Sequence, residues 1–525
     1  MNGYRPGPLS AAVRRVLEQA VRVYGDRPEP AATLRAQLRR LDEPLRVAIA
    51  GQVKAGKSTL LNALVGEPVA PTDAGECTSV VTWYRDGHSP RVVARPRDGE
   101  PVALPVVRRD GALVIDLQGL RADELDHLAV DWPSQSLRAT TLIDTPGIAS
   151  TSAEASRRTV AFVDPDDEGS SSDADAVVYL MRHLHVSDVN LLEAVRDQGV
   201  APAGAVNAVA VLSRADEIGA GRLDALFSAR AVAGRYRADP TVRALCQDVV
   251  AVAGLLAETG RTLRAPEHAA MAALAGLPRA ELDDALMSVD RFTRSDGPVA
   301  DAAGSADRRA ALLHRFGLFG IRLCTTLVRQ GADTPADLAG EMIARSGLPD
   351  LQRVLHTQFT QRRELLKARS GLLALERVLR AEGDADGPLA REVERILAGA
   401  HVFAELRLLA ALRAGTVPLP RELVGDAELL LGAAGPAPHL RVGLPPGAGP
   451  AELRSAAFAA LRRWQHHAAN PLLRRAATDA CQVVVRSCEG ILAVLAPAPA
   501  DPVTGPPVRV AAHTPGSTPG EAREP

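Results

Sequence analysis

The residues best suited to chemistry in this sequence lie in one glycine-rich loop. The stretch GQVKAGKS, from Gly51 to Ser58, follows the pattern GxxxxGK[ST]. It comes directly after the apolar run Leu45–Ala50, typical of a buried strand, and a helical pattern opens at Thr59. In such a loop backbone N–H groups surround phosphate oxygens, a lysine such as Lys57 bridges the β- and γ-phosphates, and a hydroxyl such as that of Ser58 binds Mg²⁺. The loop therefore predicts a nucleoside triphosphate site.

Lysine is scarce in the rest of the chain. Of 61 basic residues only three are lysine, at positions Lys54, Lys57 and Lys367, and two of these lie in the loop. The abundance of Ala, Arg, Gly and Pro indicates a GC-rich coding background, which favours arginine wherever charge alone is needed. Lysine inside the loop therefore indicates chemistry that needs a compact ammonium group rather than a planar guanidinium.

A second motif, Asp144-Thr-Pro-Gly147, follows the strand-like run Ala139–Ile143. At that place Asp144 can hold Mg²⁺ through a water molecule, and the N–H of Gly147 can contact the γ-phosphate. The alternative for these four residues alone is a plain β-turn after a strand.

A third motif, Ser213-Arg-Ala-Asp216, follows the strand-like run Ala205–Leu212. The Asp216 carboxylate can accept hydrogen bonds from N1–H and the 2-amino group of guanine, a donor pair that adenine lacks, and Arg214 can stack on the base. A surface salt bridge between Arg214 and Asp216 is the alternative. The order of the three motifs, each at a strand end, predicts GTP and GDP rather than adenine nucleotides.

These motifs require a sheet whose strands end at one edge. Five further runs indicate strands, at Val80–Tyr84, Arg91–Ala94, Leu113–Leu117, Ala176–Met181 and Asp248–Val252, with helical patterns between several of them. Alternation of apolar strands and helices predicts a mainly parallel sheet with helices on both faces. We therefore expect residues 45–265 to form an α/β P-loop GTPase domain.

The rest of the chain has helical periodicity. Residues 1–44 predict two helices, and residues 266–496 predict an elongated all-α bundle, in which 349–381 would be one helix about 50 Å long. Glycine- and proline-bearing breaks at 382–388 and 415–450 divide this region, and residues 497–525 predict a disordered tail.

Composition limits the remaining possibilities. The 525 residues have a formal net charge of −2, so they give no global attraction to nucleic acid or anionic lipid, and we expect no nucleic-acid partner. The five scattered cysteines indicate idle thiols in a reducing compartment. No run is long and apolar enough for a membrane span, because Phe316–Val328 is short and contains Arg322, and the N-terminus lacks an apolar signal region. We therefore expect a cytoplasmic protein.

Five segments of the GTPase region resemble the dynamin superfamily of large GTPases, most closely the actinobacterial dynamin-like proteins of the isoniazid-inducible group. They are GQVKAGKSTLLNAL (51–64), PTDAGECTSVVTWY (71–84), TLIDTPGI (141–148), DAVVYLMRHLHVSDVNLLEA (175–194) and VLSRADEIG (211–219). Vaguer likeness at 315–323 and 346–359 extends into the helical part. The resemblance implies a GTPase head, a neck that includes the N-terminal helices, a trunk that contacts or remodels membranes, and GTP-dependent contact between heads.

The resemblance also assigns roles to single residues. Thr78, 21 residues after Lys57, would be the switch threonine that binds Mg²⁺ and orients the attacking water. Ala253 and Gly254 would lie near the guanine, and the acidic stretch 164–175 could form a loop at the head-to-head surface. The expected nucleotide-binding set is Gly51, Lys54, Ala55, Gly56, Lys57, Ser58, Thr59, Thr78, Asp144, Gly147, Ser213, Arg214, Asp216, Ala253 and Gly254. Lys54, Lys57 and Thr78 would be catalytic, and Ser58, Thr78 and Asp144 would hold the metal.

Two positions depart from related GTPases. Ile148 stands where small signalling GTPases have a water-positioning glutamine, and a hydrocarbon cannot orient water. Val53 and Lys54 stand where animal dynamins have Gln and Ser, of which the serine helps to hold a catalytic monovalent cation. We hypothesise that the Lys54 ammonium replaces that cation, the alternative being a solvated loop lysine.

The membrane contact that the resemblance implies has two candidate segments. Residues 462–475 combine an aromatic with basic side chains, which suits an anionic surface, although a solvated face of a trunk helix is the favoured alternative. The Leu-rich stretch 427–444 is either an insertion loop or a buried hairpin. A second, membrane-bound dynamin-like protein could instead provide the contact.

Three functions are consistent with this sequence. The first is a dimerisation-stimulated GTPase at the inner face of the cell membrane. The second is a non-catalytic scaffold gated by nucleotide binding, and the third, disfavoured by the neutral charge, is a regulatory GTPase that serves the ribosome or RNA.

Overall fold

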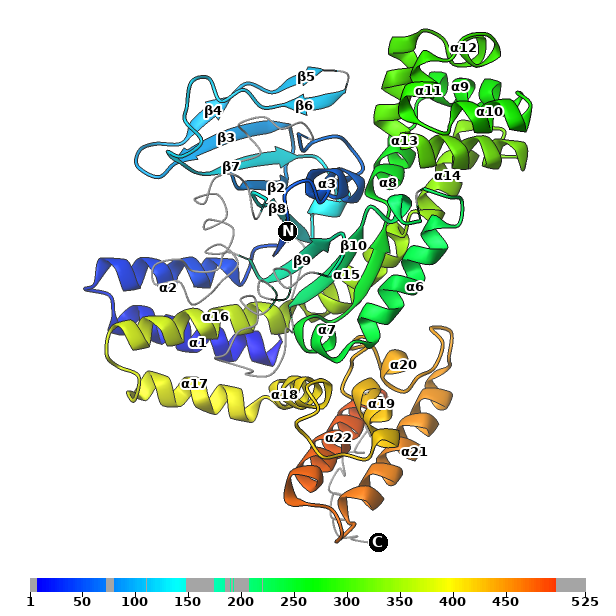
Figure 1. Ribbon diagram of the computed structural model, residues 1–525. Helices are drawn as coiled ribbons and strands as arrows, with labels where there is room; N and C mark the ends of the chain where they lie inside the picture. Colours follow the sequence, from blue (N-terminus) through cyan, green and yellow to red (C-terminus); the bar gives the residue numbers. More distant parts are fainter. Residues whose placement is uncertain are drawn as a thin grey trace, which may run out of the picture.

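The computed structural model describes residues 7–71, 80–109, 111–147, 174–184, 189, 192, 207–219 and 221–496. Figure 1 shows a central sheet with helices on either side and a separate group of helices below. The fold class predicted from the sequence, an α/β domain followed by an all-α region, is confirmed.

The described residues form one nine-stranded sheet in the order β11-β10-β9-β1-β8-β2-β7-β3-β4. β11, β10, β9, β1 and β8 are all parallel, so their carboxyl ends lie at one edge. The strands are β1 Leu45–Gly51, β2 Thr82–Asp86, β3 Arg91–Pro96, β4 Val102–Leu104, β7 Leu125–Trp132, β8 Thr140–Asp144, β9 Ala176–Met181, β10 Ala208–Ser213 and β11 Val249–Val252. A separate hairpin pairs β5 Val107–Arg109 with β6 Ala112–Val114.

The other end of the sheet is mixed. β2 is antiparallel to β8 and parallel to β7, and β3 is antiparallel to both β7 and β4. β7 was not expected, because charged residues such as Asp126 and Asp131 interrupt its apolar pattern. The prediction of a strand over Leu113–Leu117 is wrong beyond Val114, because β6 ends at that residue.

Both faces of the sheet are covered, as a parallel sheet requires. In β1, Val47 and Ile49 belong to one buried cluster, and Ala48 and Ala50 to the cluster on the opposite face. α3 (Lys57–Val65) contributes to the first cluster, and α6 (Ala225–Ala238) and α7 (Pro240–Leu245) contribute to the second. The small alanines of β1 let the second layer approach closely.

The helical part forms three groups, which lie in different places in Figure 1. A side lobe contains α8 Gly254–Arg261, α9 Ala265–Ala275, α10 Arg279–Ala285, α11 Val289–Arg294, α12 Pro298–Ala303, α13 Ala306–Arg329 and α14 Pro335–Arg345. The neck helices are α1 Pro8–Val23, α2 Pro28–Arg40, α15 Leu348–Gln358, α16 Arg363–Ala381 and α17 Pro388–Gly399. An end group contains α18 His401–Arg413, α19 Arg421–Leu430, α20 Pro438–Arg441, α21 Pro450–Ala468 and α22 Arg475–Val494.

The single helix expected over 349–381 is wrong. α15 ends at Gln358, a short 3₁₀ turn covers Thr360–Arg362, and α16 starts at Arg363. At this break the Gln358 amide donates to the carbonyl of Ala433 (2.9 Å), and the buried Arg362 donates to the carbonyl of Gly432. The side chains of the break therefore bind the end group, a long-range contact that helical periodicity cannot reveal.

The N-terminal helices are fixed to α16. The Ser10 N–H at the start of α1 donates to the Glu364 carboxylate (3.0 Å), and the Tyr24 hydroxyl at its end donates to Asp384 (3.2 Å). The acidic turn after α16 therefore anchors α1.

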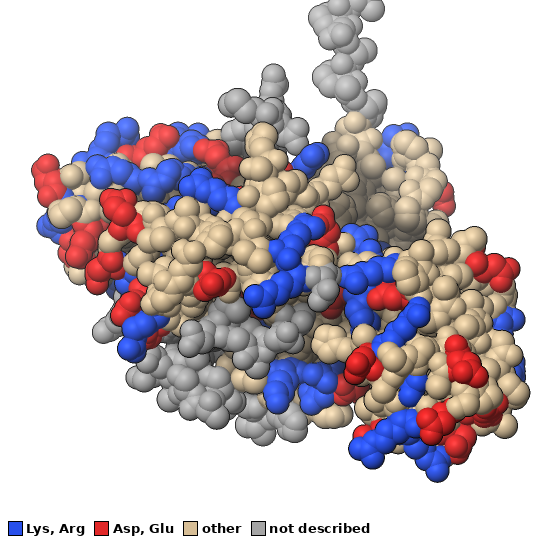
Figure 2. Space-filling model, turned by 90° about the horizontal axis from the view of Figure 1, so that it is seen from above, with Lys and Arg blue, Asp and Glu red and all other residues tan. Residues whose placement is uncertain are grey.

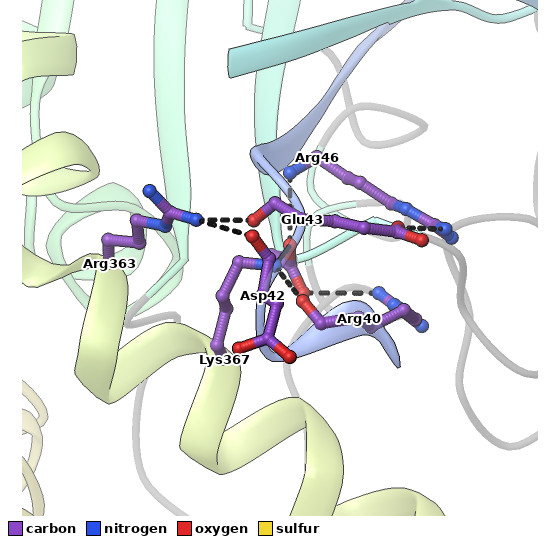
Figure 3. A network of polar contacts seen from close by, with 7 residues as sticks. Arg40, Asp42, Glu43, Arg46, Arg363 and Lys367 are labelled. Atoms are coloured by element: carbon purple, nitrogen blue, oxygen red, sulfur yellow. Dashed lines mark hydrogen bonds and ion pairs between the residues drawn. The ribbon is translucent and has the colours of Figure 1, made fainter. Parts of the chain in front are cut away.

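A buried polar network joins the neck helices to the sheet (Figure 3). Asp175, directly before β9, pairs with Arg40 of α2 (3.1 Å) and with Lys367 of α16 (3.7 Å), and its side chain accepts the Arg46 N–H (2.9 Å). Arg363 donates to the Glu43 carbonyl at 2.5 Å. Burial alone would raise the pKa of Asp175, but the Arg40 and Lys367 cations hold it below its ordinary value.

The end group contains both segments considered for membrane contact. Trp464 is fully buried and its indole N–H donates to Asp426 (2.7 Å), which also pairs with Arg463 (2.8 Å). The aromatic side chain of segment 462–475, which membrane contact would require at the surface, is therefore in the interior. In 427–444, Leu430 and Leu431 are buried, which agrees with the buried hairpin rather than with an insertion loop.

Among the described helices, α13 alone is long and apolar enough to cross a membrane. Half of its apolar window is buried, and Arg309, Arg315 and Arg322 lie along it. Gly317, at φ 64°, interrupts its helical geometry. These features are those of a core helix in the side lobe.

Candidate nucleotide site

The glycine-rich loop leaves the carboxyl end of β1 and closes at the start of α3. Gly51 lies against β9, because a Cβ there would come within 2.4 Å of the Leu180 carbonyl oxygen. Lys54 and Gly56 both adopt left-handed backbone conformations, at φ 61° and 92°. This sharp turn directs the chain into the N-terminus of α3, where free backbone N–H groups and the helix dipole favour phosphate.

Three charged or polar side chains of the loop and β8 meet beside it. The Ser58 hydroxyl donates to Asp144 Oδ2 at 2.8 Å, and Lys57 Nζ lies 3.3 and 3.2 Å from the carbonyl oxygens of Gly51 and Gln52. Burial lowers the pKa of Lys57 and raises that of Asp144, and in each case the opposite charge of the other residue partly offsets the shift. The ammonium is thus held at the mouth of the phosphate loop.

The chemistry of this pair fits Mg²⁺. The second carboxylate oxygen of Asp144, Oδ1, is buried and has no hydrogen-bond partner in the described structure. A buried carboxylate oxygen beside a hydroxyl is the kind of hard-oxygen set that Mg²⁺ prefers, with most of its shell left to water and phosphate. Ser58 and Asp144 are therefore the residues that would hold the ion.

The turn that begins at Asp144 is packed directly against the loop. Thr145 is buried and its hydroxyl donates to the Ile49 carbonyl of β1 at 2.9 Å. A Cβ on Gly147 would lie 2.6 Å from Cγ2 and 2.8 Å from Cα of Val53. Any larger residue at position 147 would therefore force the turn or the phosphate loop to shift.

The base-side motif follows β10 and opens a 3₁₀ turn, Ala215–Glu217. Ser213 donates to the Met181 carbonyl (3.2 Å), which ties the motif to β9. Arg214, at φ 51°, pairs with Glu217 (2.5 Å) and donates to the Lys54 carbonyl (2.9 Å). Its guanidinium therefore connects this motif to the phosphate loop.

Asp216 has no ion-pair partner among the described residues. The structure does not contain the alternative Arg214–Asp216 salt bridge, because Arg214 pairs with Glu217. Burial raises the pKa of Asp216. A half-buried carboxylate without a cation is available to accept two N–H groups from a base.

Ala253 and Gly254 join β11 to α8. Ala253 is fully buried and its N–H donates to the Ser346 carbonyl at 2.8 Å. A Cβ on Gly254 would meet Thr59 Cγ2 at 3.6 Å, so this loop lies beside the start of α3.

The structure thus brings the motifs to one edge of the sheet, at the ends of β1, β8, β10 and β11. A small hollow at this edge is lined by Pro71, Val80, Thr82, Tyr84, Ile115, Asp144 and Thr145. Thr78 and Ile148 lie outside the described residues, as does most of the acidic stretch 164–175.

Two residues beside the site were not expected. Asn62 of α3 and Glu258 of α8 form a buried hydrogen bond at 2.9 Å. The available signal was a polar residue in the middle of the apolar run LLNAL.

Comparison with known proteins agrees with this geometry. Residues 47–104 match the model of the dynamin family. The isoniazid-induced protein IniC of Mycobacterium tuberculosis is 42% identical over 493 residues, which cover 92% of this chain and 98% of that protein. A bacterial dynamin-like protein of Nostoc punctiforme is 32% identical over 119 residues, 21% of this chain and 17% of that protein.

A solved structure of an oligomerised bacterial dynamin pair, described as sensing and tethering membranes over long range, aligns with 93% of this chain and 75% of that one. The identity is 12% and the TM-score 0.29. The close relative over nearly its full length and the match of the dynamin model to the phosphate-loop region establish the family. The chain belongs to the dynamin family, as a bacterial dynamin-like protein.

Proposed function

We propose that this protein hydrolyses GTP to GDP with Mg²⁺, and that contact between the GTPase domains of two copies raises the rate. The observation that carries the proposal is the convergence of three motifs at one edge of the sheet, with Asp144 Oδ1 and the Asp216 carboxylate both available to ligands. The base-side carboxylate favours guanine and the phosphate loop accommodates a triphosphate.

Each residue contributes binding or charge rather than covalent chemistry. Lys57 exchanges its contacts with loop carbonyls for oxygens of the β- and γ-phosphates, and the N–H groups of Gly56 to Ser58 bind the same phosphates. Mg²⁺, held by Ser58 and Asp144, would neutralise charge on those oxygens. Thr78, by family resemblance, would join that set and orient the attacking water. Positioning and electrostatics supply the rate.

Lys54 supplies a further charge in this proposal. Its backbone is fixed in a left-handed turn, its carbonyl is bound by Arg214, and its side chain is exposed at the loop. The ammonium would neutralise charge that builds between the β- and γ-phosphates, in place of a monovalent cation. Lys54→Ala should lower GTP turnover at least tenfold and should make the remaining activity respond to K⁺. Unchanged turnover, or a wild type that needs K⁺, would exclude this role.

At the cellular level we propose a peripheral protein at the inner face of the membrane, in division or envelope maintenance. The supporting observation is the turn between α21 and α22, where Leu472 is 89% exposed and Arg474 and Arg475 follow it. An exposed apolar residue next to arginines suits an anionic lipid surface. A second dynamin-like protein remains a candidate partner.

The rival proposal is a scaffold gated by GTP binding without efficient hydrolysis. It is supported by Val53 of the phosphate loop, which is 41% exposed and whose side chain offers no hydrogen bond to an attacking water. Both proposals require GTP binding and differ only in turnover.

The test is GTP turnover per molecule over a range of protein concentrations, with ATP as control nucleotide and Lys57→Ala as control variant. A rate that rises with concentration for GTP alone supports the dimerisation-stimulated GTPase. A flat and very slow rate, with GTP binding intact, refutes it and supports the scaffold.

A further inference from the structure

Asn62 of α3 uses every hydrogen-bonding position of its buried amide. Its Oδ1 accepts the N–H groups of Val69 (2.9 Å) and Ala70 (2.7 Å). Its Nδ2 donates to the Ala70 carbonyl (3.0 Å) and to Glu258 Oε1 (2.9 Å). The side chain is 1% exposed, so no water can replace these partners. One asparagine thus fixes three backbone groups of the loop that follows α3.

That loop leads to the metal side of the nucleotide site. Pro71, the residue after Ala70, lines the hollow that Val80, Asp144 and Thr145 also line. Pro71 and Val80 are the described residues on either side of the segment that contains Thr78. The position of Ala70 therefore determines where the chain arrives beside Asp144.

Glu258 holds Asn62 from the opposite side. It is a buried carboxylate in α8, the helix that begins at the base-side residue Gly254. Burial raises the pKa of Glu258, while its hydrogen bond from Asn62 and the charge of Arg315 oppose that shift. A buried carboxylate without a hydrogen-bond donor destabilises the fold. The hydrogen bond with Asn62 therefore satisfies the Glu258 carboxylate as well as the Asn62 amide.

α8 also belongs to the side lobe. The Thr259 hydroxyl donates to the Arg315 carbonyl of α13. A Cβ on Gly260 would meet Ile343 and Met342 of α14 at 3.1 Å, so α8 and α14 are in close contact. The residues on either side of Glu258 in space are therefore the loop at the metal site and the helices of the lobe.

We propose that Asn62 and Glu258 are a positioning pair, which holds the loop Gly66–Pro71 beside Asp144 and makes GTP turnover depend on the seating of α8 in the side lobe. The proposal rests on the GTPase function proposed above and adds a regulatory connection to the same site. The partners of Asn62 are Val69, Ala70 and Glu258, and neither member of the pair belongs to the expected nucleotide-binding set. Their effect on turnover passes through the loop.

Four variants test the pair. Asn62→Ala and Glu258→Ala remove it, Glu258→Gln keeps an acceptor for the Asn62 amide, and Glu341→Gln is an exposed control on α14. We expect kcat to fall at least tenfold in Asn62→Ala and less in Glu258→Ala, because loss of buried partners releases the loop. The affinity for a fluorescent GTP analogue should stay within about threefold of wild type, and Glu258→Gln should restore most of the rate.

Amide hydrogen exchange gives the second measurement. Exchange at residues 66–70 should accelerate at least tenfold in Asn62→Ala and stay slow in Glu258→Gln. Faster exchange with unchanged kcat would overturn the positioning role, as would a fall in GTP affinity that equals the fall in kcat. If Asn62→Ala does not fold, Glu258→Ala compared with Glu258→Gln decides the question. A wild type without GTPase activity refutes the proposed function, whereas the exchange result still decides whether the pair holds the loop.

Discussion

At the scale of single residues, the guanine recognition that we propose depends on Asp216, a carboxylate that pairs with no cation among the described residues. We expect Asp216→Asn to weaken GTP binding at least tenfold, because two charge-assisted hydrogen bonds are lost or inverted. Xanthosine triphosphate should bind the variant better than wild type, since its 2-oxo group accepts a hydrogen bond from the new amide. Competition binding with GTP, ATP and xanthosine triphosphate measures both effects.

The control for this change is Asp224→Asn, an exposed carboxylate on the same stretch of chain. It should leave all three affinities unchanged. Equal affinities for GTP in wild type and Asp216→Asn would show that the base is recognised elsewhere.

Gly147 tests the contact between the turn after β8 and the phosphate loop. In Gly147→Ala the new methyl group would lie 2.6 to 3.0 Å from three atoms of Val53, namely Cγ2 and the backbone atoms Cα and N. One of the two segments must move, which costs about 1–3 kcal/mol and should lower GTP turnover at least tenfold. Truncation of Val53 to alanine in the same chain should restore little, because the Cα and N atoms remain.

The matched control is Gly340→Ala, a helical glycine of α14 whose Cβ would meet nothing within 4 Å. Thermal unfolding and GTP turnover of this variant should match wild type or improve slightly, since alanine favours helix. If Gly147→Ala also behaved in this way, the close approach to Val53 would not matter for the site.

The motif residues could be placed from sequence because each follows an apolar run, and parallel strands end at a common edge. The partners of those residues could not be placed. That Arg214 pairs with Glu217 and Lys54 rather than with Asp216 depends on its left-handed backbone. Nor does the sequence reveal the role of Asn62, because its partners Val69, Ala70 and Glu258 reach it only in the tertiary fold.

At the scale of elements, the joint between the neck helices and the sheet depends on Asp175. Its carboxylate is 1% exposed and faces Arg40 and Lys367, whose side chains are 6% and 4% exposed. In Asp175→Asn both cations lose their carboxylate, and we expect the free energy of unfolding to fall by about 3–5 kcal/mol. Chemical denaturation at pH 7 measures this loss.

The pH dependence of this effect has a defined sign. Since the pKa of Asp175 is lower in the folded protein, its stabilisation is complete above its unfolded value of about 4. The difference between wild type and Asp175→Asn should therefore shrink only as the pH falls below about 4. Burial lowers the pKa of Lys367 to about 8, so Lys367→Met should restore part of the stability of Asp175→Asn. The exposed pair Arg395–Glu392 is the control, and Glu392→Gln should change stability by less than about 1 kcal/mol.

The elements that the sequence predicted best are the long apolar strands of the parallel half, such as β9, whose limits agree to the residue. Those predicted worst have mixed patterns or long-range partners. β7 alternates apolar residues with Asp126 and Asp131, and the helix over 349–381 breaks where Gln358 and Arg362 bind Ala433 and Gly432. Local periodicity contains no information on such contacts.

At the scale of the whole molecule, the end group packs against the GTPase domain. Arg243 of α7 pairs with Glu428 of α19, and Arg413 of α18 donates to Gln247 at 3.1 Å. Charge is not separated over the surface seen in Figure 2, where Lys and Arg lie among Asp and Glu. Since the whole chain has a net charge of −2, an attraction to anionic lipid would need a local feature.

The turn between α21 and α22, which we propose as that feature, lies at the end of the molecule away from α9–α12 in Figure 1. Leu472 would enter the lipid interface while Arg474 and Arg475 contact headgroups, each basic residue contributing about 1 kcal/mol. We expect Leu472→Ser with Arg474→Glu and Arg475→Glu to lower co-sedimentation with phosphatidylglycerol vesicles at least tenfold. Binding of the wild type should weaken with salt and be absent on neutral vesicles.

The matched control lies on the neck, where Arg22 and the 58% exposed Val23 form a similar apolar and basic pair. Val23→Ser with Arg22→Glu should leave vesicle binding unchanged, and circular dichroism should show both variants folded. If the α21–α22 variant still bound vesicles like wild type, lipid contact through this turn would be excluded. If the wild type bound no vesicles at all, a membrane-bound partner would be needed to bring the chain to the membrane, because neither this turn nor other exposed apolar side chains of the end group, such as Phe458 and Val494, would then bind lipid unaided.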